Sequence, residues 1–359
     1  MNGQTLRSAI FSTVRLNPYV SLLADGMRAA SPLVQPALFE RLTLGWCLRE
    51  RGQYDIIHIH WAELQYKAGT ARARWRRFGS FAAALALAKL SRKRIVYTLH
   101  NLTQHEGRHG RLNRWANRLL FAWADAIHVH DESVAEAVAP LLRNAGKVFI
   151  IPHGNYVGCY PDQVTRDEAR RQLGLDQDRY VYLTLGGLRP YKGIEELIAA
   201  FRATEGDDVR LVIAGHPHEP AYAEEIRERI AGDERIMAYL AHVPDEQVQV
   251  YMRAADVCVL PYRRVTTSGA AILALSFHLP IIAPAIGPFP TLIKDTAGIA
   301  YGASDADGLR IALEQARRID RETAGESIDR YLAGITWEKV GEQHAAMYRQ
   351  ISGVNHVRS

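Results

Sequence analysis

The sequence has little cysteine and no long apolar run, and both absences restrict what the protein can be. Its three cysteines, Cys47, Cys159 and Cys258, are scattered and odd in number, so they predict neither a disulfide framework nor a zinc site. No stretch of about 18 apolar residues is present, so no transmembrane helix is predicted. The N-terminus lacks a cationic region followed by a long apolar core, so we expect no signal peptide. These features favour a cytoplasmic protein.

Short apolar strands alternate with helical patterns along the whole chain. Apolar residues make up 48% of the 359 residues and charged residues 23%, as in a soluble globular enzyme, and the length suggests two domains. The alternation predicts parallel sheets built from right-handed βαβ units. We therefore expect an α/β protein with two doubly wound, Rossmann-like domains, 1–155 and 156–335, and a final helix in 336–359 that packs back toward the first domain. Strands are expected at 8–14, 34–38, 54–60, 94–100, 126–130 and 148–151, then at 180–185, 210–214, 236–239, 257–260 and 280–283.

A glycine turn joins a predicted strand to a predicted helix in the sequence YLTLGGLRPYKG, residues 182–193. Gly187 and its neighbours let the backbone approach a ligand, and the following helix presents free N–H groups to an anion. Arg189 can hold a phosphate through its planar fork, and Lys192 can do so through its point charge. No complete dinucleotide-binding or P-loop pattern is present, so an ordinary strand-to-helix turn with two solvated cations is the alternative.

A second candidate anion site follows a later strand. Arg263 precedes Thr267, Ser268 and Gly269, and an apolar helical run comes next. Ser268 is a good N-cap and Gly269 permits close approach, so the start of this helix is suited to a phosphate. Two such helix starts in one domain indicate a diphosphate ligand more strongly than either does alone.

The net charge of +5 is unevenly distributed. Residues 67–94 contain nine basic side chains and no acidic one, and an apolar stretch at 78–90 lies between arginines within this segment. Three interpretations fit: an amphipathic helix on an anionic membrane, a basic groove for an anionic acceptor, or a buried domain helix with cationic ends. No recognised nucleic-acid motif surrounds the charges, so we expect no nucleic-acid partner.

Taken together, these motifs resemble the GT-B glycosyltransferases of group 1 and family 4. The matching segments are YDIIHIHW, IVYTLHN and ADAIHVHDES in the first half, and GGLRPYKGIEELIAAF, LVIAGHP, AYLAHVPDEQVQVYMRAADVCVLPYR and TSGAAILALSFHLPIIAP in the second. Within that group the chain resembles bacterial β-mannosyltransferases that use GDP-mannose and build exopolysaccharide repeat units on a polyprenyl-diphosphate lipid. The resemblance implies two domains facing a cleft. It also implies that the second domain binds the donor through Gly187, Arg189, Lys192, His216, Arg263, Thr267, Ser268 and Gly269.

The resemblance further implies a nucleoside-diphosphate sugar as donor, a polyprenyl-diphosphate-linked saccharide as acceptor, and no cofactor or protein-bound metal. The protein would then contact the anionic inner face of the plasma membrane. His100 ends a strand where related enzymes have a histidine near the sugar; a buried structural histidine is the alternative. The pairs His58/His60 and His128/His130 share a strand face merely because they alternate, so we predict no metal site there.

The chain also departs from the retaining enzymes of family 4. Those enzymes carry two glutamates eight positions apart, where this chain has Val265 and Leu273. The arginine expected five positions before the lysine is Gly187, and Arg189 is displaced toward the lysine. The glycine pair expected after the first strand is replaced by residues 15–19. These departures favour an inverting reaction.

An inverting transferase needs a general base that takes a proton from the acceptor hydroxyl. We expect this base in the first domain. Glu63, just after a predicted strand, is the first candidate, with a surface carboxylate paired to a cation as the alternative. Asp131 and Glu132 come next, and Glu106 is a weaker candidate.

The expected function is transfer of mannose from GDP-mannose, with inversion, to a lipid-linked or saccharide acceptor. Three alternatives stay open. A retaining family 4-type enzyme would use a UDP-sugar. A hexosamine 2-epimerase would use the same fold without an acceptor, and a non-catalytic protein would bind a sugar nucleotide as the partner of another transferase.

Overall fold

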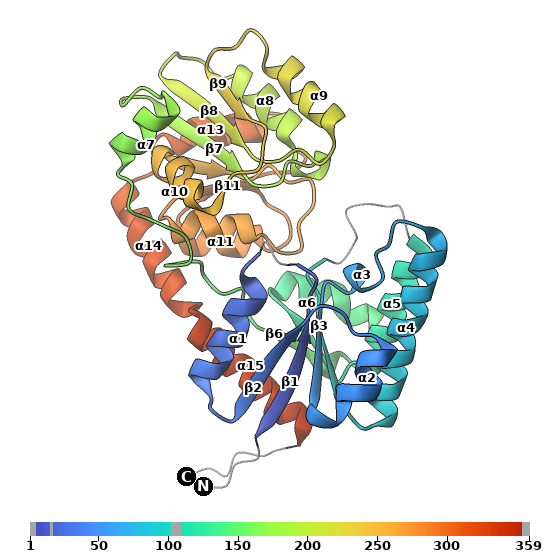
Figure 1. The fold of residues 1–359 in the computed structure, drawn as a ribbon. Helices are drawn as coiled ribbons and strands as arrows, with labels where there is room; N and C mark the ends of the chain where they lie inside the picture. Colours follow the sequence, from blue (N-terminus) through green and yellow to red (C-terminus); the bar gives the residue numbers. More distant parts are fainter. Residues whose placement is uncertain (1–4, 15–16, 102–109, 354–359) are drawn as a thin grey trace. The chain divides into compact units, whose positions relative to one another are not determined.

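The computed structural model describes residues 5–14, 17–101 and 110–353. The chain forms two compact units (Figure 1). The N-terminal unit comprises residues 1–154 together with 335–359, and the C-terminal unit comprises residues 155–334. Each unit contains one six-stranded parallel sheet with helices on both faces, so the predicted α/β class and doubly wound architecture are confirmed.

The sheet of the N-terminal unit has the order β2-β1-β3-β4-β5-β6. Its strands are β1 (Leu6–Phe11), β2 (Val34–Phe39), β3 (Ile56–His60), β4 (Arg94–Thr98), β5 (Ala126–Val129) and β6 (Val148–Ile150). Its α-helices are α1 (Tyr19–Ala30), α2 (Leu44–Glu50), α3 (Ala62–Gln65), α4 (Ala71–Leu90), α5 (Gly110–Trp123), α6 (Glu132–Val138) and α15 (Trp337–Ser352).

The final helix α15 packs tightly on α1. A Cβ atom added to Gly26 of α1 would lie 2.1 Å from the Trp337 carbonyl oxygen, and one added to Gly341 of α15 would lie 2.3 Å from the Gly26 carbonyl carbon. The two glycines therefore let the helix backbones approach each other closely. Val340 and Tyr348 of α15 are consequently buried in the same apolar cluster as α1.

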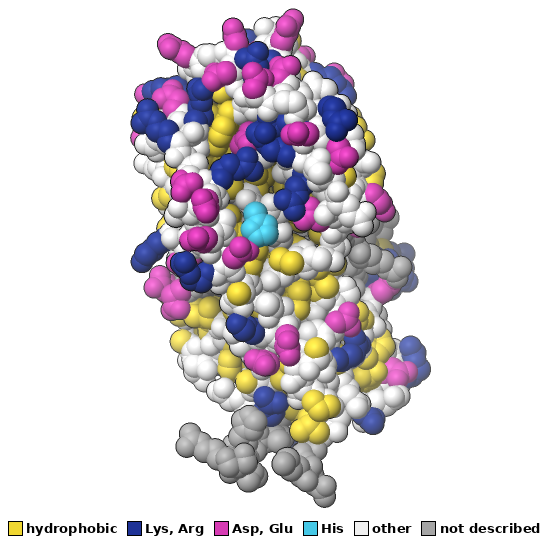
Figure 2. Space-filling model, turned by 90° about the vertical axis from the view of Figure 1, so that its left-hand side faces the viewer, with side chains coloured by type: hydrophobic (Ala, Val, Ile, Leu, Met, Phe, Trp, Pro, Cys, Tyr) yellow, Lys and Arg dark blue, Asp and Glu magenta, His cyan; other side chains and the backbone are white. Residues whose placement is uncertain are grey.

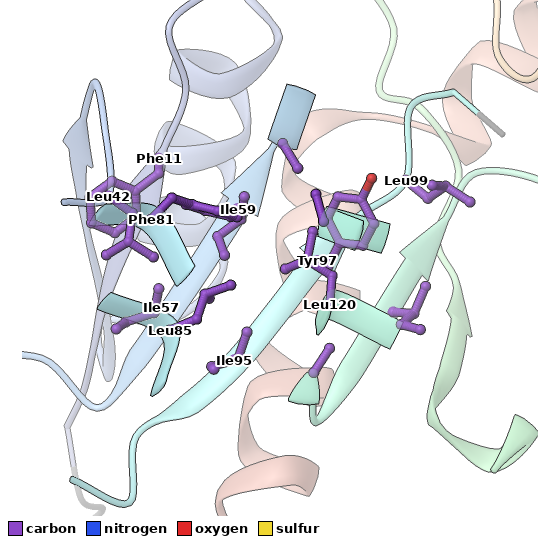
Figure 3. Close-up of a cluster of buried hydrophobic side chains, with 14 of the residues drawn as sticks. Phe11, Leu42, Ile57, Ile59, Phe81, Leu85, Ile95, Tyr97, Leu99 and Leu120 are labelled. Carbon is purple, nitrogen blue, oxygen red and sulfur yellow. The ribbon is translucent and has the colours of Figure 1, made fainter. Parts of the chain in front are cut away.

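The opposite face of the sheet is covered by α2, α4 and α5. Figure 3 shows Phe81 and Leu85 of α4 lying among Ile57, Ile59 and other strand residues in this core. These side chains are fully or almost fully buried. The apolar stretch at 78–90 is therefore a domain helix whose apolar face is buried against the sheet. Contact of its outer, basic surface with a membrane stays a prediction.

The C-terminal unit has the sheet order β12-β11-β10-β7-β8-β9, the Rossmann arrangement. Its strands are β7 (Tyr180–Leu185), β8 (Val209–Ala214), β9 (Ile236–Tyr239), β10 (Val257–Val259), β11 (Ile281–Pro284) and β12 (Ile299–Tyr301). Its α-helices are α7 (Arg166–Leu173), α8 (Ile194–Arg202), α9 (Pro220–Ile230), α10 (Asp245–Ala254), α11 (Gly269–Ser276), α12 (Phe289–Thr296), α13 (Gly308–Ala316) and α14 (Arg321–Gly334). β12 and the three helices α12 to α14 were not predicted from the sequence.

At the amino edge of this sheet, Asp256 ties several elements together. Its carboxylate accepts hydrogen bonds from Arg170 Nη2 (2.7 Å), Arg166 Nη2 (2.9 Å), Arg321 Nη1 (2.8 Å) and the backbone N–H of Val181 (2.8 Å). On the face that carries α7 and α14, Figure 2 shows basic side chains gathered around a hollow. The hydrogen bonds to Asp256 fix the starts of β7 and β10, whose carboxyl ends form the opposite edge of the sheet.

Candidate active-site residues in the two units

Two loops at the carboxyl edge of the C-terminal sheet are locked together. Gly193 has a φ of 69°, and a Cβ atom there would lie 2.0 Å from the Pro261 carbonyl oxygen. The backbone N–H of Arg263 donates to the Tyr191 carbonyl oxygen at 2.9 Å. Only glycine fits at position 193, and the loop after β7 is thereby held against the loop after β10.

Lys192 lies over the glycine turn. A Cβ atom at Gly186 would be 3.5 Å from Lys192 Nζ, which also lies 5.3 Å from the centroid of the Tyr262 ring. Burial, and then the nearby Arg189 charge, lower the pKa of Lys192, although Tyr191 opposes this effect. Lys192 forms no ion pair with any carboxylate among the described residues. A desolvated ammonium group without a carboxylate is stabilised by an anionic ligand.

The second predicted anion site is also a helix start. Ser268 is the N-cap of α11, and its hydroxyl accepts a hydrogen bond from the Ala271 backbone N–H at 3.2 Å. Ser268 also lies near enough to the phenol of Tyr262 to lower its pKa, against the larger raising effect of burial, and Lys192 overlies the same ring. Tyr262 therefore lies near both Ser268 and Lys192, although the sequence did not single it out.

Other predicted donor-binding residues differ in their surroundings. Arg263 pairs with two carboxylates of α8, through Nε to Glu196 Oε1 at 2.6 Å and through Nη2 to Glu195 Oε2 at 3.3 Å. Its charge is therefore balanced within the protein. Gly187 and His216 are exposed, whereas Thr267 and Gly269 are half-buried. Their roles in donor binding stay predictions.

In the N-terminal unit, Glu63 lies just beyond the carboxyl end of β3. Trp61 precedes α3 in the left-handed conformation, with a φ of 43°, and its ring stacks on His100 at 3.8 Å with an interplanar angle of 6°. Asn101, next to His100, donates from Nδ2 to Glu63 Oε1 at 3.5 Å. Burial raises the pKa of Glu63 above its usual range. A raised carboxyl pKa makes Glu63 a stronger base near neutral pH.

The two alternative carboxylates in the following loop are placed differently. Asp131 is the N-cap of α6, and its Oδ1 accepts from the Ser133 backbone N–H at 2.8 Å and from the Ser133 hydroxyl at 2.5 Å. Glu132 lies in the first turn of α6, where a carboxylate stabilises the positive helix end. Both carboxylates therefore have structural roles. An Asp-Glu-Ser sequence directly after a strand is typical of a capped helix start. Glu106 lies outside the described residues.

His100 belongs to a larger group of buried histidines. Its Nε2 lies 3.0 Å from His60 Nδ1, and His60 Nε2 is buried with no hydrogen-bond partner in the described part of the chain. Burial is the main reason that the pKa of every member lies below its ordinary value, and neighbouring histidines add to the effect for most of them. The members are His58, His60, His100, His128, His130, His153 and His344. His100 is therefore a neutral imidazole, which suits hydrogen bonding to a sugar hydroxyl.

The histidine group has no metal-binding geometry. Among the residues that the structure describes, no three or more His, Cys, Asp or Glu side chains are arranged to hold a metal ion. That the alternating histidine pairs form no metal site stays a prediction. Local sequence spacing could not predict that these histidines lie together, because His344 lies on α15, far along the chain from the others.

Comparisons with known proteins agree with the fold and with the motif order. Residues 165–324 match the family model described as Glycosyl transferases group 1, and residues 23–155 match that of Glycosyltransferase Family 4. The chain is 29% identical over 357 residues to the GDP-mannose:glycolipid 4-beta-D-mannosyltransferase of Xanthomonas campestris pv. campestris, covering 96% of this chain and 93% of that protein. It is 27% identical over 323 residues to the D-inositol 3-phosphate glycosyltransferase of Actinosynnema mirum, covering 85% of this chain and 74% of that protein.

Solved structures show the same architecture. Sucrose-phosphate synthase from Thermosynechococcus elongatus superimposes with a TM-score of 0.74 at 20% identity, covering 98% of this chain and all of that one. WaaG, a glycosyltransferase involved in lipopolysaccharide biosynthesis, gives a TM-score of 0.68 at 15% identity, covering 97% of this chain and all of that one. These likenesses establish the fold, and the two family models cover most of the sequence. The chain is therefore a hexosyltransferase that belongs to the GT-B glycosyltransferases, with a family 4 domain followed by a group 1 domain.

Proposed function

We propose that this glycosyltransferase moves mannose from GDP-mannose, with inversion, onto a polyprenyl-diphosphate-linked saccharide. The observation that carries the donor assignment is Lys192, a desolvated cation above a glycine turn without a carboxylate partner among the described residues. The sugar and the nucleotide base are proposed from the Xanthomonas relative, whose name specifies GDP-mannose and a glycolipid.

In this proposal the diphosphate of the donor lies against the Lys192 loop and the start of α11. Lys192 supplies a point charge, Arg189 supplies a planar fork, and the N-terminus of α11 supplies backbone N–H groups. These groups stabilise the negative charge that grows on the leaving diphosphate as the bond to the sugar breaks. No further cofactor is needed for this charge balance.

The inverting course is supported by the residues that are missing. Val265 and Leu273 occupy the positions of the two family glutamates, and Leu273 is buried, so neither can contact a sugar or a ribose through a carboxylate. Glu63 supplies a carboxylate in a desolvated environment instead. In the proposed step, Glu63 takes the proton of the acceptor hydroxyl. The hydroxyl oxygen then bonds to the anomeric carbon, and the bond from that carbon to the diphosphate breaks, releasing GDP.

We also propose that the outer surfaces of α4 and α5 contact an anionic membrane. The two helices pack side by side and together contain eight basic residues and no acidic one. Trp75 is 55% exposed and Trp115 is 58% exposed, each near the N-terminus of its helix. Tryptophan and arginine are typical of membrane interfaces. No helix in the described part of the chain is long and apolar enough to cross a bilayer.

The direct test of the proposed function is nucleotide release from a panel of donors, with and without a polyprenyl-diphosphate disaccharide. We expect GDP release from GDP-mannose that depends on the acceptor, and little release from UDP-sugars. Acceptor-independent conversion of UDP-N-acetylglucosamine would instead indicate the epimerase, and release from no donor would indicate a binding protein.

The proposed membrane contact is tested by the double variant Trp75→Ser with Trp115→Ser. This variant should cosediment less with phosphatidylglycerol vesicles than the wild type does, and unchanged cosedimentation would contradict the membrane contact.

A further inference from the structure

The first two turns of α4 contain a cluster of positive charges, and both the helix dipole and like-charge repulsion make this cluster unfavourable. Arg72, Arg74, Arg76 and Arg77 all lie there, at the positive end of the helix dipole. Arg72 and Arg76 are separated by one helical turn, as are Arg74 and Arg77, so each pair adds like-charge repulsion. This arrangement destabilises the isolated helix, and a negatively charged partner would offset the repulsion.

A fifth arginine, Arg41, joins this group from the loop between β2 and α2. The Leu44 backbone N–H donates to Ser80 Oγ of α4 at 3.0 Å, which places the start of α2 beside the turn that contains Arg77. Gln65 fixes the same loop, because its Oε1 accepts from the Leu42 N–H at 2.9 Å and its Nε2 donates to the Glu40 carbonyl oxygen at 3.3 Å. The loop therefore holds Arg41 next to α4.

The surroundings of Arg41 leave part of its guanidinium group unsatisfied. Its Nη1 atom is buried and has no hydrogen-bond partner among the residues that the structure describes. Burial, and then the charge of Arg77, lower the pKa of Arg41. Arg77 itself donates to the Lys67 carbonyl oxygen, which holds its guanidinium group over the loop that leads into α4.

Four of these arginines are not neutralised by any described residue. Among the described residues, Arg41, Arg72, Arg76 and Arg77 form no ion pair with a carboxylate. By contrast, Lys89 and Arg94 farther along the same segment both pair with Asp125. The unpaired charge is thus concentrated at the N-terminus of α4, which lies at the carboxyl edge of the sheet with Glu63 and His100.

We propose that Arg41 and Arg77 form a binding site for the diphosphate group of the acceptor. This inference rests on the proposed function only for the identity of the acceptor. The site itself follows from the buried Arg41 Nη1 atom, which has no hydrogen-bond partner among the described residues, in a loop held beside the turn of α4 that contains Arg77. Neither arginine pairs with a carboxylate in the described part of the chain. Two planar forks can each hold two oxygens of a phosphate, so a pair of them matches a diphosphate better than a single carboxylate.

A lipid headgroup carries the same phosphate chemistry as the diphosphate of the acceptor, but the two ligands predict different results. A diphosphate site requires Arg41, which is recessed in the loop. Binding to a vesicle surface depends on the exposed arginines Arg72 and Arg76 and on Trp75. Arg41→Gln should therefore weaken diphosphate binding and leave vesicle binding unchanged.

The experiment is calorimetric titration of the full-length protein with inorganic pyrophosphate in the presence of saturating GDP, which blocks the donor site. Arg41→Gln and Arg77→Gln should each weaken pyrophosphate binding by about tenfold to a hundredfold, as expected for charge-assisted hydrogen bonds. Arg49→Gln, on the exposed side of α2, is the matched control and should bind as the wild type does. Thermal denaturation of each variant checks that it is folded.

Two further measurements separate this site from the membrane and from the transfer reaction. Cosedimentation with phosphatidylglycerol vesicles should not change in Arg41→Gln. The KM for a diphosphate-linked acceptor should rise in that variant, whereas the KM for an alkyl glycoside without a diphosphate should not. Absence of pyrophosphate binding by the wild type, or equal binding by Arg41→Gln, would overturn the site whatever donor the enzyme uses. Failure of GDP-mannose as donor would leave the comparison of wild type with Arg41→Gln standing, because the groups of the donor site are the same in both proteins.

Discussion

His344 Nε2 lies 3.3 Å from His128 Nδ1 in the interior of the N-terminal unit, and in the neutral rings both of these atoms carry lone pairs. The reason is that the other nitrogen of each ring faces a carbonyl oxygen, which can only accept. His128 Nε2 donates to Ile151 O at 2.9 Å, and His344 Nδ1 donates to Val340 O at 2.8 Å. The Thr98 hydroxyl, 3.0 Å away, satisfies His128 Nδ1. His344 Nε2 is left facing an acceptor.

This arrangement predicts that the protein loses stability in mild acid. Because the histidine pKa values are lowered in the folded state, the unfolded chain binds protons first as the pH falls below about 6.5. Each such histidine then lowers the free energy of unfolding by up to about 1.4 kcal/mol per pH unit. The loss continues to the folded-state pKa, which is about 4 for His153 and His344 and about 3 for His130.

Urea denaturation between pH 7.5 and 5 measures this effect. The free energy of unfolding of the N-terminal unit should fall steeply over that range. His344→Gln should reduce the slope by about one proton, whereas His242→Gln, an exposed histidine of the C-terminal unit, should not change it. A stability that is constant from pH 7.5 to 5 would contradict the neutral histidine core.

The donor site can be tested by comparing two cations. Lys192→Gln should weaken GDP-mannose binding by about tenfold to a hundredfold, because it removes a desolvated charge that has no carboxylate partner among the described residues. Arg263→Gln should have a smaller effect, because Glu195 and Glu196 already neutralise Arg263. Calorimetry with GDP-mannose measures both. Equal affinities of wild type and Lys192→Gln would rule out the proposed diphosphate position.

The packing of the glycine turn gives a stability prediction. Gly193→Ala should lower the Tm of the C-terminal unit and impair donor binding, since the new Cβ would collide with the Pro261 carbonyl oxygen and the φ of 69° is unfavourable for alanine. Gly187→Ala is the matched control, because no atom lies within 4 Å of its added Cβ. An unchanged Tm for Gly193→Ala would show that the two loops are not locked as described.

Much of the architecture could be predicted because strands and helices leave local signals. The apolar runs that became β3, β4, β7 and β8 are buried on both faces, so they read as continuous strands. β12 was missed because it is only three residues long and none of them is fully buried, so no apolar pattern marks it. The apolar stretch of α4 could not be assigned from sequence alone, since a buried helix and a membrane-lying helix share the same pattern.

The candidate site was predictable only where the residues are close in sequence. Gly193 and Lys192 follow one another in a recognisable turn, and Ser268 has an N-cap signature. The pairing of Arg263 with Glu195 and Glu196 joins segments almost 70 residues apart, and no spacing rule indicates it. The position of the Arg41 loop beside α4 depends on tertiary packing for the same reason.

The general base is tested by a substitution that keeps the shape of the side chain. Glu63→Gln should lower kcat by about 10² to 10⁴, because the amide cannot accept the acceptor proton. Donor affinity should change little, since the donor groups belong to the C-terminal unit. Asp131→Asn is the comparison, and a loss of turnover confined to that variant would move the base to Asp131.

The measurement that tests the central claim most directly is the anomeric configuration of the product formed from GDP-α-mannose and a polyprenyl-diphosphate disaccharide. NMR coupling constants of the purified glycolipid distinguish the two outcomes. The replacement of both family glutamates by Val265 and Leu273, together with the desolvated carboxyl of Glu63, predicts a β-mannoside. An α-mannoside would contradict the inverting mechanism and with it the role assigned to Glu63.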